Sequence, residues 1–249
     1  MYKENSTFIQ PENENIMIWR YMDFAKFNYL LENKKLFFAR VDKFDDQFEG
    51  SWPKKSSEVR NQFTAGSSEE DRRLKIIALK ERTILLKQHF AVSCWHANEC
   101  ESAAMWILYL KSNAGIAVQS TYKLLKSSLV DTEDIFLGKV TYLNYQTETI
   151  KFYDPIAPFM HKRMSFEHER EIRALTTKQP LTKEKQWDLS LETIKDGLPI
   201  SVDLRNLVQK IYVAPNSPEW FLEMVLKAVK RYHYTWEVKQ STMDDNPWF

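Results

Sequence analysis

Alternating apolar and polar residues predict short strands separated by helices along most of the chain. Residues 16–21 alternate between two faces, as in a buried strand, and residues 232–239 alternate in the same way near the other end. Between residues 76 and 90, apolar side chains recur at intervals of three and four, which is the spacing of one helical face. Ser217 and Pro218 are typical of the first positions of a helix. These patterns indicate an α+β protein.

The same reasoning gives the other elements and the domain organisation. Strands are expected at residues 36–41, 90–95, 116–119, 135–143 and 202–213, and helices at 24–31, 101–110 and 122–129. No internal repeat divides the chain. We therefore expect a polar N-terminal arm at 1–15 and a single α+β domain at 16–249, with a helical insertion at about 51–90.

Composition removes several classes of protein. Thirty-five basic and 34 acidic residues give a formal net charge of +1, so no overall field draws the protein to nucleic acid or membrane. Two cysteines, Cys94 and Cys100, are too few for a disulfide framework. No run of 18 apolar residues occurs, so we expect a cytoplasmic protein with no membrane partner. The five glycines form no G-x-G or G-x-x-x-x-G-K pattern, which argues against the common nucleotide-binding loops.

The most informative segment is 162–175, where charged residues enter a predicted strand. Glu169, Glu171 and Arg173 are spaced two apart and would share one face of that strand. A buried charge without a partner is costly, so Glu171 is either half of an internal salt bridge or a carboxylate that faces a ligand. Arg20, on the apolar face of the first strand, needs a carboxylate or a phosphate for the same reason.

Other titratable residues follow less specific patterns. The internal partners available to Arg20 are Asp46, Glu49 and Glu171. The acidic turn at 45–49 could hold a hard cation, but no EF-hand pattern surrounds it, and we expect no metal. No two of the five histidines have the H-x-x-x-H spacing of a zinc site. Cys94 and His96 could form a nucleophile pair, although a free cysteine commonly packs as a small apolar residue.

Two groups of side chains allow both a structural and a functional interpretation. Trp95, Trp106 and Tyr109 either pack in the core or stack on a planar ring of a ligand. The basic residues of the helix expected at 72–87 either form a solvated face or hold a polyanion. The sequence leaves both choices open.

Several motifs, taken in order, resemble a bacterial family catalogued as domain of unknown function 2971. They are W-R-Y at 19–21, D-D-Q-F-E at 45–49, S-C-W at 93–95, E-S-A-A-M-W-I-L-Y at 101–109, G-I at 115–116 and E-R-E-I-R at 169–173. The resemblance covers roughly residues 16–240. It implies a bacterial protein and brings no established reaction with it.

The motif order also resembles, more weakly, the DarT-type toxins of the ADP-ribosyltransferase superfamily. The corresponding pieces are Arg20-Tyr21, 102–109, 170–173 and 207–213. This likeness implies an α+β fold with a split, twisted, mixed or antiparallel central sheet flanked by helices, and NAD held in a cleft between two small sheets. It places Glu171 at the catalytic position. Arg20 stands where the toxins usually have a histidine, and Glu101 where their segment has an arginine.

The resemblance implies cleavage of the bond between nicotinamide and ribose in NAD, the expected substrate. The carboxylate of Glu171 would stabilise the oxocarbenium-like centre and orient or deprotonate the acceptor. The residues implied in NAD binding are Arg20 on the pyrophosphate, Tyr21 with Trp106 or Tyr109 on nicotinamide, and Ser93 or Ser102 on its amide or the ribose, with Trp95 and Arg173 beside them. Asp46 and Glu49 would form a supporting acidic turn.

The expected function is an NAD-dependent ADP-ribosyltransferase or NAD glycohydrolase of a bacterial toxin or phage-defence system. A nucleic-acid or protein acceptor and an antitoxin or regulatory partner would accompany it. Two other functions fit the same residues. The first is a metal-dependent nuclease or other phosphate-processing enzyme, with the 72–87 helix on the backbone and the carboxylates Asp46, Glu49, Glu169 and Glu171 on the metal. The second is a non-catalytic binding or sensor module, whose buried network comprises Arg20, Glu49, Glu171 and Arg173.

Overall fold

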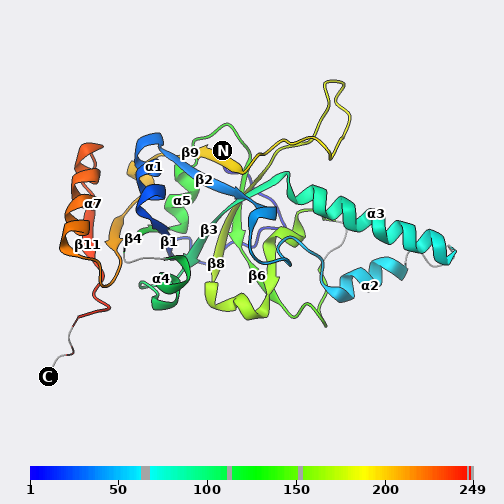
Figure 1. Ribbon diagram of the computed structural model, residues 1–249, viewed down its shortest axis with the longest axis horizontal. Coiled ribbons are helices and arrows are strands. Elements are labelled where there is room, and N and C mark those ends of the chain that lie inside the picture. The colour runs from blue at the N-terminus through cyan, green and yellow to red at the C-terminus, as the bar shows by residue number, and fades with distance from the viewer. Residues whose placement is uncertain (63–67, 111–113, 151–153, 246, 248–249) are drawn as a thin grey trace.

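The computed structural model describes residues 1–62, 68–110, 114–150, 154–245 and 247, and its central element is a mixed β-sheet (Figure 1). Within these residues, nine strands form one sheet. They are β1 (Met17–Asp23), β2 (Lys35–Arg40), β3 (Phe90–Ala97), β4 (Gly115–Thr121), β5 (Ile135–Lys139), β8 (Glu171–Thr177), β9 (Gly197–Ser201), β10 (Lys210–Val213) and β11 (Glu237–Gln240). A separate pair of parallel strands consists of β6 (Thr141–Leu143) and β7 (His161–Arg163).

Helices pack against this sheet and also project from it. They are α1 (Phe24–Asn33), α2 (Lys54–Gln62), α3 (Glu69–Lys87), α4 (Ala103–Tyr109), α5 (Tyr122–Ser128), α6 (Leu204–Leu207) and α7 (Glu219–Arg231), with short 3₁₀ helices at Val41–Lys43, Ala157–Met160 and Met164–Glu169. Most strand pairs are antiparallel, whereas β10 and β11 are parallel. The α+β class with a mixed central sheet is therefore confirmed.

The sheet divides along β3, and this division positions the site. One edge of β3 pairs continuously with β8, from Phe90 opposite Thr177 to His96 opposite Glu171. The other edge pairs with β1 only at its C-terminal end and with β2 only at its N-terminal end. In the described pairings, the stretch 93–95 therefore has a partner on one side only, because β1 and β2 diverge there.

The largest apolar core lies against β1, β3 and β4, and two smaller clusters cover other residues of the same strands. Ile18, Trp95, Val118 and Phe221 are each at most 2% exposed within it. Helix α7 covers the β10–β11 end of the sheet by burying Phe221 and two other residues of one helical face. The burial of long apolar side chains in this layer supplies the main driving force for folding.

The N-terminal arm packs along β5 and contributes to the fold. Phe8 is 3% exposed and stacks on Phe136 at a centroid distance of 5.3 Å. Isolated bridges join Tyr2 to Ile135 and Ile9 to Lys139. The arm is polar in composition, but its few apolar residues are enough to dock it on the edge of the sheet.

Several expected elements differ in extent from those observed. The strand expected at 202–213 is interrupted by α6, because Asp203 accepts a hydrogen bond from the Arg205 amide and starts a helical turn. The last strand begins only at Glu237, after His233 adopts a left-handed conformation with φ of 59°. The strand at Glu171 begins at that residue, because Arg170 is left-handed with φ of 41°. The expected shared strand face of Glu169 and Glu171 is therefore not formed.

The insertion at 51–90 consists mainly of α2 and α3, which project from the side of the molecule opposite α7 (Figure 1). Ser68 caps α3 by accepting a hydrogen bond from the Asp71 amide at 3.1 Å. No residue of α3 is fully buried, although Ile76, Leu79 and Leu86 are partly covered. Within the described part of the chain, no helix is long and apolar enough to cross a membrane.

Candidate functional site

A cavity of about 730 Å³ opens at the place where the sheet divides. Its walls come from β1, α1, β2, β3, α4 and the residues around the start of β8. Five of the residues expected from the sequence line it together: Arg20, Tyr21, Trp95, Tyr109 and Glu171. A volume of this size is within the range of pockets that bind small molecules, which runs from about 300 to 1,000 Å³.

Arg20 projects from β1 into this cavity without a carboxylate partner. Its Nη1 donates a hydrogen bond to Ser93 Oγ, and its Nη2 donates to the carbonyl oxygen of Phe37 at 2.9 Å. The guanidinium carbon lies 5.8 Å from the centre of the Trp95 ring. Among the described residues it forms no ion pair, and burial lowers its pKa. The expected anionic partner within the protein is thus absent, and neutral acceptors orient the cation instead.

Glu171, the first residue of β8, is 4% exposed and holds its negative charge against two cations. Its Oε1 accepts from Arg173 Nε at 2.6 Å, and its Oε2 accepts from Arg173 Nη2 at 3.0 Å and from Lys162 Nζ at 3.2 Å. The Cys94 thiol lies beside this carboxylate and contributes to lowering its pKa. Burial raises the pKa of Glu171, but Arg173 and Lys162 outweigh it and hold the pKa well below its usual range.

Arg173 joins Glu171 to the acidic turn that the sequence singled out. Its fully buried guanidinium donates from Nη1 to Glu49 Oε1 at 2.5 Å and to the carbonyl oxygen of Phe159. On the other side of Glu171, Lys162 also pairs with Glu169. These contacts form a chain, called here the ion-pair network, of Glu49, Arg173, Glu171, Lys162 and Glu169. Three carboxylates and two cations leave it with one negative charge in excess.

Asp46 does not belong to this network. Its Oδ1 accepts a hydrogen bond from Arg163 Nη2 at 2.8 Å, and the Arg163 guanidinium lies over the Phe48 ring at 4.3 Å. The expected supporting acidic turn therefore divides its two carboxylates between two different arginines. Neither Asp46 nor Glu49 lines the cavity, and Glu49 is connected to it only through Arg173 and Glu171.

Helix α4 positions the aromatic wall of the cavity. Ser102 caps the helix, and its amide donates a hydrogen bond to the Tyr21 hydroxyl at 2.8 Å. The edge of Trp106 meets the Tyr21 ring at a centroid distance of 4.8 Å. The rings of Tyr21 and Tyr109 are inclined by only 25°, with centroids 6.5 Å apart. Ser102 and Trp106 thus position Tyr21, whereas Tyr21 and Tyr109 themselves face the cavity.

His96 and Cys94 complete the wall between the aromatic rings and Glu171. His96 Nδ1 lies 2.6 Å from the carbonyl oxygen of Glu169, which can only accept, so the proton resides on Nδ1 and Nε2 is an acceptor. Among the described residues Nε2 has no partner. Burial lowers the pKa of His96 and raises that of Cys94, so the ring is neutral and the thiol protonated. A protonated Cys94 agrees with structural packing better than with a nucleophile.

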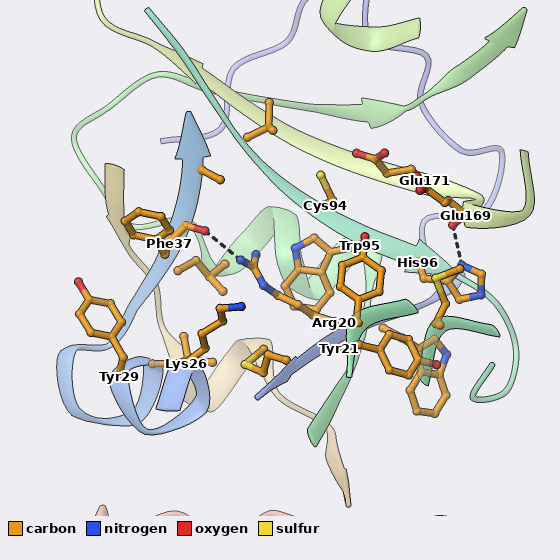
Figure 2. A pocket seen from close by; sticks show the side chains of 18 of the residues that line it. Arg20, Tyr21, Lys26, Tyr29, Phe37, Cys94, Trp95, His96, Glu169 and Glu171 are labelled. Carbon is orange, nitrogen blue, oxygen red and sulfur yellow. Dashed lines mark hydrogen bonds between the residues drawn. The ribbon is translucent and has the colours of Figure 1, made fainter. Parts of the chain in front are cut away.

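The two ends of the cavity carry opposite charges (Figure 2). Arg20 and Lys26 lie toward one side, near Phe37 and Tyr29, and Glu169 and Glu171 lie toward the other. Lys26 makes an exposed ion pair with Asp23 and remains accessible to solvent. A ligand that fills this cavity would meet cations at one end and carboxylates at the other.

Sequence reasoning missed the residues at the cationic end. Lys26, Tyr29, Lys35 and Phe37 line the cavity, yet none belongs to a motif or stands out by spacing. One structural feature sets this group apart: the Phe37 ring is exposed, whereas its neighbours in the strand, Leu36 and Phe38, are buried. Such an outward-facing ring in a strand marks a surface but does not show that a cavity lies beneath it.

No protein-family model and no curated protein matches the chain. Among solved structures it is similar to DarT of Thermus sp. 2.9 in complex with NAD+, with 10% identity and a TM-score of 0.41, over 93% of this chain and 97% of that one. It is similar to the same protein in complex with ADP-ribosylated ssDNA, again with 10% identity and a TM-score of 0.41, over 94% and 96% of the two chains. The resemblance to the domain of unknown function 2971 stays a prediction.

Proposed function

We propose that the cavity binds NAD and that the protein cleaves the bond between nicotinamide and ribose, either as an ADP-ribosyltransferase or as an NAD glycohydrolase. The observation that supports this most directly is the polarity of the cavity, with an uncompensated guanidinium at one end and excess negative charge at the other. NAD has the same polarity, because its pyrophosphate is anionic and its nicotinamide ring is cationic. Charge complementarity of this kind orients a ligand as it binds.

The anionic part of NAD fits the end that carries Arg20. A guanidinium binds phosphate oxygens through two parallel hydrogen bonds, and Ser93 and Phe37 already hold this one in place. Because its present partners are neutral, a phosphate would supply the first full counter-charge. A preorganised cation loses little side-chain entropy on binding, which favours affinity.

The cationic part of NAD fits the opposite end. The nearly parallel rings of Tyr21 and Tyr109 offer faces for a planar nicotinamide. As the bond to nicotinamide breaks, positive charge moves to the ribose, and the negative excess of the ion-pair network stabilises that charge in a site with little water. The neutral His96 ring also lines this end of the cavity, with its Nε2 buried.

Glu171 would contact the ribose only by exchanging one of its present donors. Arg173 and Lys162 donate charge-assisted hydrogen bonds, whereas the Cys94 thiol beside Glu171 is at most a weak donor. A ribose hydroxyl would therefore replace Cys94 and leave the ion pairs intact. Glu171 then acts as the catalytic carboxylate, while Arg173 holds it in orientation and keeps it ionised at neutral pH.

The decisive experiment is to incubate the purified protein with NAD and to quantify released nicotinamide by chromatography. We expect release by the wild type, and a loss of about 10²-fold or more in Glu171→Gln, which keeps the shape but removes the charge. Glu237→Gln, at an exposed position on β11, is the matched control and should retain full activity. If the wild type neither binds NAD nor releases nicotinamide, the proposal is wrong.

A second function, a non-catalytic binding or sensor module, is favoured by one observation. Every carboxylate of the ion-pair network is already paired inside the protein, as in a structural network. Binding of NAD in calorimetry without any nicotinamide release would support this function over the enzyme. Arg20 would still bind the ligand in that case, because it is not part of the network.

The observations do not favour the nuclease. Its four expected metal ligands, Asp46, Glu49, Glu169 and Glu171, are each paired with a lysine or an arginine of the protein. No residue of helix α3 (Glu69–Lys87), the expected contact to a nucleic-acid backbone, lines the cavity. Our proposal also includes a nucleic-acid or protein acceptor, an antitoxin or regulatory partner, and a role in a bacterial toxin or phage-defence system. Growth arrest on expression that Glu171→Gln relieves would support such a role.

A further inference from the structure

Two aromatic side chains lie at the cationic end of the cavity and have no role in the chemistry proposed above. Phe37 of β2 is 43% exposed and Tyr29 of α1 is 39% exposed, and both line the cavity. Figure 2 shows them at the same end, beyond Arg20 and away from Glu171. Exposed aromatic surface that borders a cavity commonly belongs to a binding site.

Phe37 is held in place by its neighbours. A β-carbon added to Gly197 of the adjacent strand β9 would lie only 2.5 Å from Cζ of Phe37, so the absence of a side chain at Gly197 leaves room for the ring. The carbonyl oxygen of Phe37 also accepts the hydrogen bond from Arg20 Nη2 at 2.9 Å. The ring and the guanidinium therefore keep a fixed relation to each other.

Tyr29 is positioned by helix α1. The buried side of this helix consists of Phe27, Leu30 and Leu31, which leaves Tyr29 on its outer side. Lys26 precedes Tyr29 by three residues, so both side chains project from the same face of the helix. An aromatic ring and an ammonium group thus line the same end of the cavity, with Lys26 between Tyr29 and Arg20 (Figure 2).

We propose that Tyr29 and Phe37 bind the adenine base of the dinucleotide, so that the site selects dinucleotides over mononucleotides. The order of side chains along the cavity matches the order of groups in NAD. Tyr29 and Phe37 meet the base, Arg20 with Lys26 meets the pyrophosphate, and Tyr21 meets nicotinamide toward the end that carries Glu171. Aromatic side chains stack on bases through their faces and need no hydrogen-bond pattern to do so.

This inference rests on the proposed function. Two ligands distinguish a failure of the base site from a failure of the proposed function. The first is a carbocyclic analogue of NAD, which is not cleaved, and the second is nicotinamide mononucleotide, which lacks the adenylyl group. Isothermal titration calorimetry of the full chain gives Kd for each ligand with the wild type, Phe37→Ala and Tyr29→Ala. Trp220→Ala is the control, because Trp220 is 63% exposed on α7, outside the cavity.

We expect each variant to bind the dinucleotide about tenfold more weakly, the size of one lost stacking contact, and to bind the mononucleotide as the wild type does. Unchanged melting temperatures would show that both variants fold. Equal weakening of both ligands, or wild-type binding of the dinucleotide by both variants, would overturn the base site while the proposed function stands. If the wild type binds neither ligand, the proposed function fails and this inference fails with it.

Discussion

The charged residues at the two ends of the cavity differ in whether the protein itself balances their charge. Arg20 is oriented by neutral acceptors and carries a charge that nothing in the described protein balances. Glu171 is enclosed by Arg173 and Lys162, and its charge is balanced before any ligand arrives. An unbalanced charge at a cavity favours a ligand, whereas a balanced one stabilises the fold. Under the function that we propose, Arg20 would serve mainly in binding, whereas Glu171 would have both a structural and a chemical role.

Glu171→Ala tests the structural half of the comparison and has the largest expected effect. Without the carboxylate, the buried cations Arg173 and Lys162 lose their shared partner, and the free energy of unfolding should fall by about 3–5 kcal/mol. Urea denaturation measures this loss. Glu237→Ala removes only exposed, solvent-screened ion pairs with Lys210 and Lys239 and should leave stability nearly unchanged. Equal effects of the two substitutions would show that the ion-pair network does not stabilise the fold.

Arg20→Gln tests the binding half. We expect NAD affinity to fall by about 2 kcal/mol, or roughly 30-fold, because a charge-assisted contact to phosphate is lost. Stability should stay the same or rise slightly, since the lost charge had no ionic partner. Titration calorimetry and thermal melting measure the two quantities, with Arg231→Gln at the exposed end of α7 as the control. A strong loss of stability without a loss of affinity would reverse the roles that we assign to the two ends.

The pH dependence of stability sharpens the contrast. The folded-state pKa of Glu171 lies below that of a free glutamate, so its contribution is complete above pH of about 4.3 and is lost as the pH falls below that value. Glu171→Gln should therefore flatten the decline of the free energy of unfolding between about pH 4.3 and the folded-state pKa of about 2. Denaturant titrations at several pH values provide the measurement. Parallel curves for the wild type and the variant would mean that Glu171 is not held by its cations.

The smallest expected effect concerns Cys94. Its thiol lies beside Glu171 and is at most a weak donor to it, so Cys94→Ala should change stability by about 1 kcal/mol and leave nicotinamide release within a few-fold of the wild type. Burial raises its pKa, so alkylation of the native protein should modify the exposed Cys100 first. Mass spectrometry identifies the modified residue. Preferential alkylation of Cys94, or abolished activity in Cys94→Ala, would mark it as a reacting group.

Much of the fold follows from patterns that the sequence displays. The alternation at 16–21 and the three-four spacing at 76–90 predict β1 and α3, because side-chain burial on one or two faces fixes the local conformation. The elements that the sequence placed least well all involve single backbone turns. Arg170 and His233 adopt left-handed conformations, and neither is a glycine that would have signalled the turn.

For the candidate site, the sequence named the charged and aromatic residues but could not pair them. Glu171 and Arg173 are close in sequence, and their salt bridge was one of the two outcomes expected. Glu49 pairs with Arg173, which is 124 positions away, whereas Arg20 pairs with neither of these residues. Both results depend on contacts between segments that are distant in the sequence. No local pattern carries that information, because pairing over such distances is set by how strands and loops pack.

The sequence by itself determined which side chains are charged, which strands are apolar, and therefore that some charges would have to enter the sheet. Tertiary structure decided which of those charges found a partner. Because β1 and β2 separate along β3, Arg20 faces open space while Glu171 faces Lys162 and Arg173. The physical reason is that the free energy of a charge depends on its surroundings in space, and these come from segments that the chain brings together only when it folds.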